Sequence, residues 1–531
     1  MIKKLHIANY KLFEAFTLEC NDELNIIVGD NEAGKSTILE AINLGLSRKL
    51  NGRFIDTELS TYLFNKRCAD AYVEAVQAGH NPALPKISIE LYFADEPELQ
   101  SLRGTNNSEG ADTVGVRLEI AFDEDYREEY EELLKTPKEI SMIPIEYYKP
   151  YWYSFANNQV TARSLQVRLS HIDASTIRLQ SGTDHYLQNI INDGLEPKER
   201  VGLAVAYRKL KELFSIQPAI EGINKKLTDR KDAITEKDLS VAIDLSQKGA
   251  WETSLTPHLN GIPFQHIGKG DQSALKIMLA LERQAEEAHV VLIEEPENHL
   301  SFTTMNSLIG KIESRCKGKQ IFATTHSAYV LNKLGMENVV LLHDRKASFL
   351  KSLPADTQAY FRKLSGYDTL RLILAKRTIL VEGPSDELIV QKAYLQKHGK
   401  LPIKDGIDVI SVRGLAFKRF LDIAKELGVS VDVVTDNDGD HAKKVVDKYK
   451  AYAACKSIRI FADVDDTLVT LEAHLLASNN RNAFNTIFGK TFAGDAELLE
   501  HMKDNKTDCA LALFDTSETI VIPDYINAAV A

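Results

Sequence analysis

Apolar and polar positions alternate along the chain with a period that changes from region to region. In the first 161 residues a period of two predicts strands, and a helical period predicts a helix from 36 to 50, after a glycine-containing turn. The predicted strands are residues 4–7, 13–18, 24–28, 86–93 and 114–122. This region is therefore expected to be a mixed α/β unit.

The middle of the chain has a different pattern. Residues 198–213 and 217–227 carry apolar side chains three and four positions apart, which predicts helices. We interpret 162–249 as a helical insertion. Strand-like segments return at 290–293, 320–323 and 339–342, so residues 250–372 are expected to complete the fold that residues 1–161 begin.

A new series of strands separated by helical segments begins after residue 373. The expected strands are residues 378–381, 407–412, 431–435 and 458–461. Strands that alternate with helices form parallel sheets through right-handed crossovers. Residues 373–531 are therefore predicted to form a separate, Rossmann-like domain, and the fold class of the whole chain is α/β.

The composition excludes several classes of protein. The chain has 531 residues, of which 44% are hydrophobic and 26% charged, enough apolar material for several globular cores. Its net charge of −12 argues against a protein that coats nucleic acid through bulk electrostatics. The apolar runs are far shorter than the ~20 residues of a membrane span, and the first residues lack the pattern of a signal peptide. We therefore expect a soluble, cytoplasmic protein.

A phosphate-binding motif lies between the predicted strand 24–28 and the helix that follows it. Its sequence fits G-x-x-x-x-G-K-[ST], in which the glycines let backbone N–H groups face phosphates at a helix N-terminus. Lys35 is expected to reach the β- and γ-phosphates of ATP, and the hydroxyl of Ser36 to bind Mg²⁺. The predicted ATP-binding residues of this loop are Gly29, Asn31, Gly34, Lys35, Ser36 and Thr37.

Two carboxylates, Glu294 and Glu295, follow the apolar strand 290–293. The first is expected to hold the Mg²⁺ of the nucleotide, and the second to polarise the water that attacks the γ-phosphate. Many proteins with this type of phosphate-binding loop carry Asp at the first position, and the longer Glu294 can also hold the metal through water.

Two further motifs resemble parts of ABC-type ATPases. Segment 268–273 precedes a predicted helix and resembles the signature loop, with Gly268, Gly270 and Gln272 as nucleotide-binding residues. His326 follows a strand and resembles the switch histidine that senses the γ-phosphate. In this class each nucleotide lies between the phosphate loop of one head and the signature of another, which implies a homodimer or higher homo-oligomer. No membrane domain accompanies the motifs, so a nucleic-acid-associated ATPase is favoured.

Acidic side chains gather after three predicted strands of the C-terminal domain. Glu382 ends the first strand and Asp386 lies one helical turn further on, whereas Asp436 and Asp438 follow a later strand and point the same way by its period of two. The last strand leads to Asp463, Asp465, Asp466 and Glu472. Converging carboxylates require cations, and hard oxygen ligands favour Mg²⁺ or Mn²⁺. Two such ions can clamp a phosphodiester, and Lys506 can add positive charge.

Glu-Gly on one strand and Asp-x-Asp on a later one resemble the TOPRIM domain of topoisomerases, primases and some nucleases. Over nearly its whole length the chain resembles the overcoming-lysogenization-defect (OLD) family of nucleases, which includes the nuclease subunit of the Gabija antiphage system. The resemblance implies an ABC ATPase head, an insertion that dimerises and a C-terminal TOPRIM nuclease. It also implies Lys506 as catalytic lysine and a set of metal ligands, namely Glu382, Asp386, Asp436, Asp438 and Glu472. Asp465 or Asp466 remains an alternative to Glu472.

The leading hypothesis is an ATP-hydrolysing DNA endonuclease that uses Mg²⁺ or Mn²⁺ and nicks or cleaves duplex DNA in bacterial antiphage defence. Its expected catalytic residues are Glu295, His326, Glu382 and Lys506. The alternative is a DNA-loading ATPase of the recombination-mediator type with an inactive TOPRIM domain. The expected partners are DNA, further copies of the chain and, by family resemblance, an operon-encoded helicase or reverse transcriptase.

Overall fold

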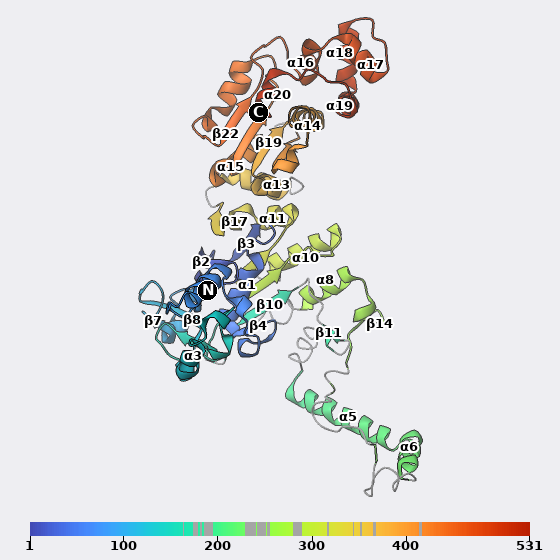
Figure 1. Ribbon diagram of the computed structural model, residues 1–531. Helices are drawn as coiled ribbons and strands as arrows, with labels where there is room; N and C mark the ends of the chain where they lie inside the picture. Colours follow the sequence, from blue (N-terminus) through green and yellow to red (C-terminus); the bar gives the residue numbers. More distant parts are fainter. Residues whose placement is uncertain are drawn as a thin grey trace.

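The computed structural model of the protein shows a head, an arm of two helices and a C-terminal domain (Figure 1). Within the described residues no helix combines the length and hydropathy that a membrane span requires. The described residues are 1–162, 164–173, 179–180, 183–184, 195–228, 240–241, 251, 255–279, 289–315, 318–343, 345–350, 353–364, 368–413 and 417–531.

The first sheet of the head is antiparallel, with the strand order β2-β1-β6-β8-β7 and with β9 paired to β8. Its strands are β1 (Ile2–Tyr10), β2 (Phe13–Glu19), β6 (Ile87–Phe93), β7 (Arg103–Gly104), β8 (Thr113–Phe122) and β9 (Tyr148–Ser154). Buried and half-buried positions alternate along β9 because one face of the sheet packs on the core. Four of the predicted strands are thereby confirmed.

The second sheet of the head has the order β10-β15-β16-β3-β17-β18 and is parallel except for its last strand. Its strands are β3 (Leu24–Gly29), β10 (Leu169–Asp173), β15 (Val290–Glu294), β16 (Gln320–Thr324), β17 (Val339–His343) and β18 (Lys346–Phe349). The loops that follow β3, β15 and β16 leave this sheet at the same edge, where parallel sheets place their functional groups.

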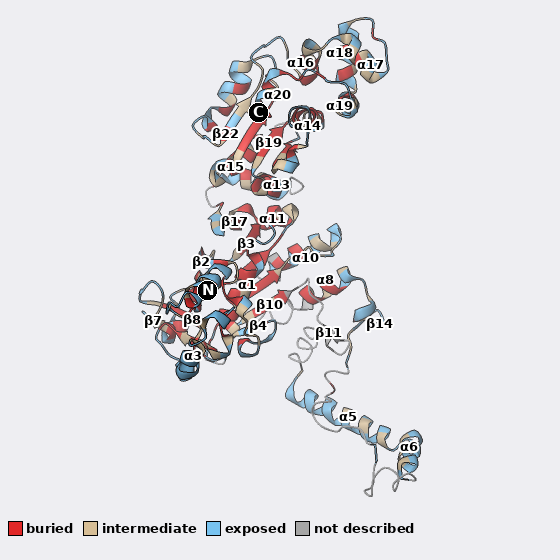
Figure 2. Ribbon diagram, viewed as in Figure 1, coloured by how far each residue is buried: buried red, intermediate tan, exposed pale blue. Residues whose placement is uncertain are grey.

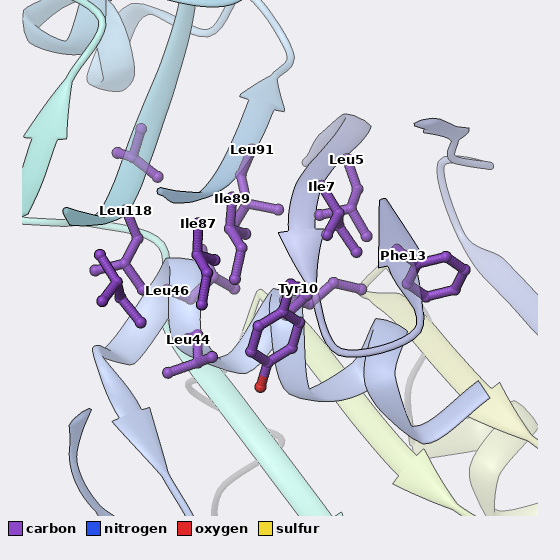
Figure 3. Close-up of a cluster of buried hydrophobic side chains, with 14 of the residues drawn as sticks. Leu5, Ile7, Tyr10, Phe13, Leu44, Leu46, Ile87, Ile89, Leu91 and Leu118 are labelled. Carbon is purple, nitrogen blue, oxygen red and sulfur yellow. The ribbon is translucent and has the colours of Figure 1, made fainter. Parts of the chain in front are cut away.

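Helix α1 (Lys35–Ser47) packs between the two sheets and contacts strands of both. Gly45 permits the close approach to β6, because a Cβ there would lie 2.6 Å from Leu91 Cδ1. The indole of Trp152 donates a 3.0 Å hydrogen bond to the Gly45 carbonyl. Figure 3 shows Leu44 of α1 in the same cluster as Leu91. The shared core fixes the start of α1 against the edge of the parallel sheet.

The predicted helix 36–50 ends earlier in the structure. Arg48 adopts a positive φ of 56°, and this left-handed conformation closes α1. Leu50 is then buried from a short hairpin, β4 (Lys49–Leu50) with β5 (Arg53–Phe54). The other head helices are α2 (Lys66–Gln77), α3 (Arg127–Leu133), α8 (Lys269–Leu279), α10 (Phe302–Arg315) and α11 (Ala328–Leu334).

The arm consists of α5 (Pro197–Ser215) and α6 (Pro218–Thr228), which confirms two predicted helices. Neither helix buries a residue, and Figure 2 shows the arm as almost entirely exposed. β10 lies inside the predicted insertion 162–249 but pairs with β15 and belongs to the head sheet. Ile172 is fully buried there, so a short apolar strand outweighed the helical trend around it. Residues 185–194, 229–239 and 242–250 of the predicted insertion lie outside the described residues.

The C-terminal domain is built on a four-stranded parallel sheet, as predicted, and the order of its strands is β20-β19-β21-β22. The strands are β19 (Arg377–Val381), β20 (Ile407–Ser411), β21 (Ser430–Val434) and β22 (Ile458–Phe461). The helices are α14 (Pro384–His398), α15 (Phe417–Leu427), α16 (Leu471–Ser478), α17 (Arg481–Phe488), α18 (Asp495–Asp504), α19 (Lys506–Asp515) and α20 (Asp524–Ala529).

The head and the C-terminal domain share a hydrophobic core. Helices α12 (Ala355–Lys363) and α13 (Thr369–Leu374) lie between them in the chain. One cluster of buried side chains runs from β3 and α11 of the head through these helices to β19 and α15. The two parts are therefore packed together directly.

Candidate nucleotide site and carboxylate cluster

The phosphate-binding loop lies between β3 and α1, as its motif requires. Gly34 caps α1 with a φ of 102°, and a Cβ there would lie 2.5 Å from Phe13 Cζ. Only glycine satisfies both the backbone conformation and the space. At the first position of the loop, a Cβ on Gly29 would lie 2.8 Å from the Leu342 carbonyl oxygen. The two glycines therefore set the path of the loop.

Lys35 is the first residue of α1 and is 7% exposed. Its ammonium donates hydrogen bonds of 2.9 Å to the carbonyls of Gly29 and Asp30. Burial lowers the pKa of Lys35, and the charges of Glu295, Asp30 and Glu297 oppose that shift. The loop thus keeps a cation next to the carboxylates that follow β15.

Ser36 and Glu294 are brought together by the fold. The hydroxyl of Ser36 donates a hydrogen bond to Glu294 Oε1, from the start of α1 to the end of β15. Both were predicted to hold the Mg²⁺ of the nucleotide. A hydroxyl and a carboxylate are hard oxygen donors that suit this ion. Of the other predicted residues of this loop, Thr37 is buried and Asn31 is exposed.

Glu295 lies beside the predicted switch histidine. His326 Nε2 is 3.4 Å from Glu295 Oε1, and the Asn298 amide donates to Glu295 Oε2 at 2.5 Å. The backbone N–H of Glu295 donates to the Thr324 carbonyl at 3.1 Å, which ties the loop after β15 to the end of β16. Glu295 has a φ of 44°, a conformation uncommon for this residue type. The two predicted catalytic groups of the head therefore share one site.

Glu297 belongs to the same site, although sequence reasoning gave it no role. Its Oε1 accepts hydrogen bonds from the Thr325 hydroxyl at 2.8 Å and from the His326 N–H at 2.6 Å. Burial is the main cause that raises the pKa of Glu297. The side chain therefore orients the backbone on which His326 is carried. The sequence signal that could have identified Glu297 was its position as a third acidic residue after β15.

The predicted loop 268–273 is shorter in the structure, because α8 already begins at Lys269. Gly268 precedes the helix and is exposed, whereas Gly270 lies in its first turn and is half-buried. A Cβ on Gly270 would lie 2.5 Å from the His299 carbonyl oxygen, whereas Gly268 has open space around it. Gln272 is 4% exposed, and its amide donates to the carbonyls of Phe264 at 2.8 Å and Ile267 at 3.1 Å. Gln272 therefore ties the first turn of α8 to the turn before the helix, and of the three predicted nucleotide-binding residues only Gly268 is exposed.

The C-terminal domain brings four of the predicted carboxylates close to one another. Burial raises the pKa of Asp386 to about 7, and the charge of Glu382 adds to the effect. Burial also raises the pKa of Asp436 to about 8, with contributions from Asp386, Glu382 and Glu472. Glu382 Oε1 accepts a 2.6 Å hydrogen bond from the Thr435 hydroxyl, which joins the ends of β19 and β21. The cluster concentrates negative charge in a buried place.

Two oxygens of this cluster are suited to a cation. Asp436 Oδ1 and Glu472 Oε2 are buried without a hydrogen-bond partner, and a buried carboxylate oxygen in that state is costly unless a cation pairs with it. Among the described residues no three His, Cys, Asp or Glu side chains already stand in the arrangement of a metal site. The donors therefore suit a divalent cation in chemistry, and their side chains must converge further to hold it.

Asp465 and Asp466, the alternatives to Glu472, are engaged by the loops around them. Asp465 Oδ1 accepts from the Thr467 N–H at 2.9 Å and from its hydroxyl at 2.6 Å. Asp466 Oδ1 accepts from the His441 N–H at 2.7 Å. Glu472, in contrast, lies on α16 and is 4% exposed, and its charge raises the pKa of Asp386 and of Asp436.

Asp438 is placed differently from its prediction. β21 ends at Val434, so the period of two no longer applies at Asp438, which has a φ of 50° in a turn. Its Oδ2 is 3.6 Å from Lys444 Nζ. Lys506, the predicted catalytic lysine, begins α19 with its Nζ 3.7 Å from Glu472 Oε1. The lysine is thus brought to the carboxylate cluster.

Asn437, between the two aspartates, is a positioning residue that sequence reasoning missed. It is fully buried, and its amide donates to the carbonyls of Asp463 at 3.1 Å and Asp465 at 2.8 Å. Its Oδ1 accepts from the Gly439 N–H at 2.9 Å. Asn437 therefore ties the loop after β21 to the loop after β22. An amide between two acidic residues gives no sequence signal for such a contact.

The phosphate loop, the paired glutamates and the histidine define an ATPase head, and comparison with known families agrees. Residues 1–331 match the AAA ATPase domain, and the chain belongs to this family. Residues 373–438 match the overcoming lysogenization defect protein-like TOPRIM domain. The predicted α/β fold, with an ATPase head followed by a TOPRIM domain, is confirmed, as is the resemblance to the OLD family.

Individual relatives are similar to the chain at low sequence identity. Endonuclease GajA from Bacillus cereus (strain VD045) is 19% identical over 503 residues, which cover 90% of this chain and 82% of that protein. Retron Ec83 probable ATPase from Escherichia coli is 20% identical over 405 residues, covering 64% of this chain and 71% of that protein. A solved SMC head bound to the C-winged helix domain of ScpA is 14% identical, covers 65% of this chain and 95% of its own, and has a TM-score of 0.31.

Proposed function

We propose that this protein is an ATP-hydrolysing, divalent-metal-dependent DNA endonuclease that nicks or cleaves duplex DNA. The observation that carries the proposal is the cluster of half-buried and buried carboxylates around the ends of β19 and β21, in which Asp436 Oδ1 and Glu472 Oε2 are buried atoms without a hydrogen-bond partner. The similarity to a protein named as an endonuclease over 90% of the chain supports it. A cytoplasmic role in antiphage defence is part of the proposal.

The metal ligands in this proposal are Glu382, Asp386, Asp436, Asp438 and Glu472. Bound Mg²⁺ or Mn²⁺ ions at such a site neutralise the carboxylates and polarise phosphodiester oxygens. Lys506, 3.7 Å from Glu472, supplies positive charge to the phosphate as negative charge develops on it. Glu472 is preferred over Asp465 and Asp466 because loop hydrogen bonds already engage one oxygen of each aspartate.

The head would bind ATP with Lys35 on the phosphates and with Ser36 and Glu294 on Mg²⁺. Glu295 would orient the attacking water, and His326, 3.4 Å away, would sense the γ-phosphate. Gly268 and Gly270 would contact the nucleotide of a second copy of the chain, so hydrolysis requires a homodimer or higher homo-oligomer. The buried side chain of Gln272 leaves it a supporting role.

We propose 1–173 and 250–372 for the head and 373–531 for the TOPRIM domain, where the sequence alone predicted 1–161 for the first segment. The pairing of β10 with β15 leads us to move the start of the insertion from 162 to the residues after Asp173. A helicase or reverse transcriptase encoded beside this protein remains the proposed type of additional partner, by family resemblance.

The rival function is a DNA-loading ATPase whose TOPRIM domain is inert. An inert domain has no need to keep a cluster of carboxylates in which Glu382 and Glu472 raise the pKa of both Asp386 and Asp436. The retained cluster therefore favours the nuclease.

Incubation of the purified protein with supercoiled plasmid and Mg²⁺ or Mn²⁺ tests the proposal. We expect nicked or linear DNA from the wild type, none from Glu382→Ala, and wild-type amounts from Glu500→Ala, which changes an exposed carboxylate of the same domain. If Glu382→Ala cuts as well as the wild type, the nuclease assignment is wrong. Absence of cutting by the wild type, with intact ATP hydrolysis, favours the loading ATPase.

A further inference from the structure

Lys448 is held beside the carboxylate cluster by two aromatic rings. It directly follows a π-helical segment, Ala442–Asp447, which continues from the turn that carries Asp438. Its Nζ lies 5.6 Å from the centre of the Phe417 ring and 5.1 Å from that of Tyr449. Both rings are buried, so the ammonium is restrained by cation–π contacts on a fixed surface. π-Helical segments are rare and occur often at functional sites.

The charges around Lys448 are those of the proposed metal site. Burial lowers the pKa of Lys448, while Glu382 and Asp438 are the two carboxylates that oppose the shift. The neighbouring cations Lys418 and Lys444 lower the pKa further. The hydroxyl of Tyr449 is also buried near Glu382 and Asp438. Lys448 and Tyr449 therefore face the ligands Glu382 and Asp438 from a different element than Lys506.

Two other basic side chains of the domain differ from Lys448 in having carboxylate partners. Lys444 is 3.6 Å from Asp438 Oδ2. Arg459 donates to both oxygens of the fully buried Asp432, at 2.6 and 2.8 Å. Lys448 Nζ forms no ion pair in the described part of the chain, where no carboxylate oxygen lies within 4.0 Å of it. A half-buried cation of this kind is favoured when an anion completes its surroundings.

We propose that Lys448 binds a non-bridging phosphate oxygen of the DNA strand that the carboxylate cluster receives. This inference rests on the proposed endonuclease function. The phosphodiester is the anion that must lie next to Glu382 and Asp438 during cutting, and an ammonium is a point-charge donor for phosphate. Lys448 is thus a substrate-binding residue of the nuclease site, while Lys506 acts next to Glu472.

Three variants test the contact. Lys448→Met keeps the aliphatic stem between the rings and removes the charge, Lys448→Arg keeps the charge, and Lys443→Met removes an exposed charge from the same π-helical segment. Plasmid cleavage is measured against DNA concentration at several salt concentrations, together with ATP hydrolysis and thermal unfolding. Duplex binding is measured by fluorescence anisotropy with an additional Asp436→Ala substitution that prevents cutting.

We expect Lys448→Met to lose about tenfold or more in cleavage efficiency, mainly through KM, and the slope of log binding constant against log salt to become shallower by about 1. Lys448→Arg should retain most of the cleavage efficiency, and Lys443→Met should retain all of it. Every variant should keep the ATP hydrolysis rate and the melting temperature of the wild type. The inference is overturned if Lys448→Met keeps the wild-type efficiency and salt slope, or if Lys443→Met loses as much.

Failure of the parent proposal looks different. If the wild type does not cut DNA with either metal, the endonuclease function fails, and the binding series still decides whether Lys448 contacts phosphate. In that case the slope of log binding constant against log salt is compared between the wild type and Lys448→Met. Equal slopes overturn the phosphate contact, and a shallower slope in Lys448→Met supports it.

Discussion

The Ser36 hydroxyl donates a hydrogen bond to the Glu294 carboxylate across 258 positions of sequence. Ser36 follows β3 and Glu294 ends β15, and β16 lies between these two strands in the sheet. The site for the nucleotide metal therefore forms only when residues before and after the arm have folded into one sheet. Binding of ATP and Mg²⁺ should report on the integrity of the whole head.

Replacement of Lys35 by Ala should weaken ATP binding by about 10- to 100-fold, because the phosphates lose a charge-assisted hydrogen bond from a cation that the loop holds in place. Hydrolysis should fall at least as far. Binding is measured with a fluorescent ATP analogue, and Lys49→Ala, an exposed lysine just beyond α1, is the control. Equal affinity of Lys35→Ala and the wild type would contradict the assigned site.

Replacement of Glu295 by Gln should separate binding from hydrolysis. The phosphate cradle stays intact, so ATP should bind with wild-type affinity, but hydrolysis should slow by about 10²–10⁴-fold because the carboxylate that polarises water is gone. A steady-state phosphate-release assay and the same binding measurement decide the point. The role fails if Glu295→Gln hydrolyses ATP at the wild-type rate.

Much of this architecture could be predicted because local pattern and global fold agree. The strands β15, β19 and β21 are short, largely apolar runs, and the catalytic motifs follow their ends, where the chain leaves the sheet. Glu294, Glu295 and His326 were therefore found at their places after β15 and β16. Glu382 and Asp436 were found in the same way after β19 and β21.

The parts that were missed depend on contacts distant in sequence. β10 is recognised as a head strand only by its pairing with β15. Asn437 acts through carbonyls of the loop after β22, and Gln272 has its amide turned inwards to Phe264 and Ile267. Residue type alone gives no indication of such partners, because an amide bonds equally well to a ligand, to water or to the backbone.

Asp436→Asn should abolish metal-dependent cutting and leave ATP hydrolysis unchanged, since the head keeps all its residues. It should also raise the melting temperature of the metal-free protein at pH 7, because burial and the neighbouring carboxylates raise the pKa of Asp436 to about 8. At that pH Asp436 must take up a proton on folding, and an amide need not. Differential scanning fluorimetry with chelator measures the second effect, with Asp504→Asn, an exposed carboxylate on α18, as the control. A lower melting temperature would speak against electrostatic crowding.

Asn437→Ala should raise the metal concentration needed for half-maximal cutting by about 10- to 100-fold, as loss of residues that orient metal ligands does. The matched control is Asn479→Ala, since Asn479 also ties two segments of this domain by donating to Leu475 and Val521 carbonyls, each at 2.8 Å. Both variants should lose stability, by about 1–3 kcal/mol for buried carbonyls left unpaired. Only Asn437→Ala should shift the metal requirement, and equal shifts would reduce Asn437 to a structural residue.

The last prediction concerns how the two halves communicate. The loop that carries His326 leads directly into α11, where Asn332 is fully buried. The Thr369 hydroxyl at the start of α13 donates to Asn332 Oδ1 at 2.8 Å, and α13 precedes β19, which Glu382 directly follows. A rearrangement at the γ-phosphate therefore has a short packed route to a proposed metal ligand, and ATP can either permit or restrain cutting along it.

Thr369→Val keeps the shape of the side chain and removes this hydrogen bond. Plasmid cleavage is measured with and without a non-hydrolysable ATP analogue in the wild type, Lys35→Ala, Thr369→Val and Ser154→Ala, which removes a buried hydroxyl from β9 away from the route. The analogue should change cutting by the wild type and by Ser154→Ala but not by Lys35→Ala, and the change should shrink in Thr369→Val, because the two helices no longer move together. If wild-type cutting is the same in every nucleotide state, the head does not gate the nuclease. If Thr369→Val responds as fully as the wild type, the signal takes a different path through the shared core.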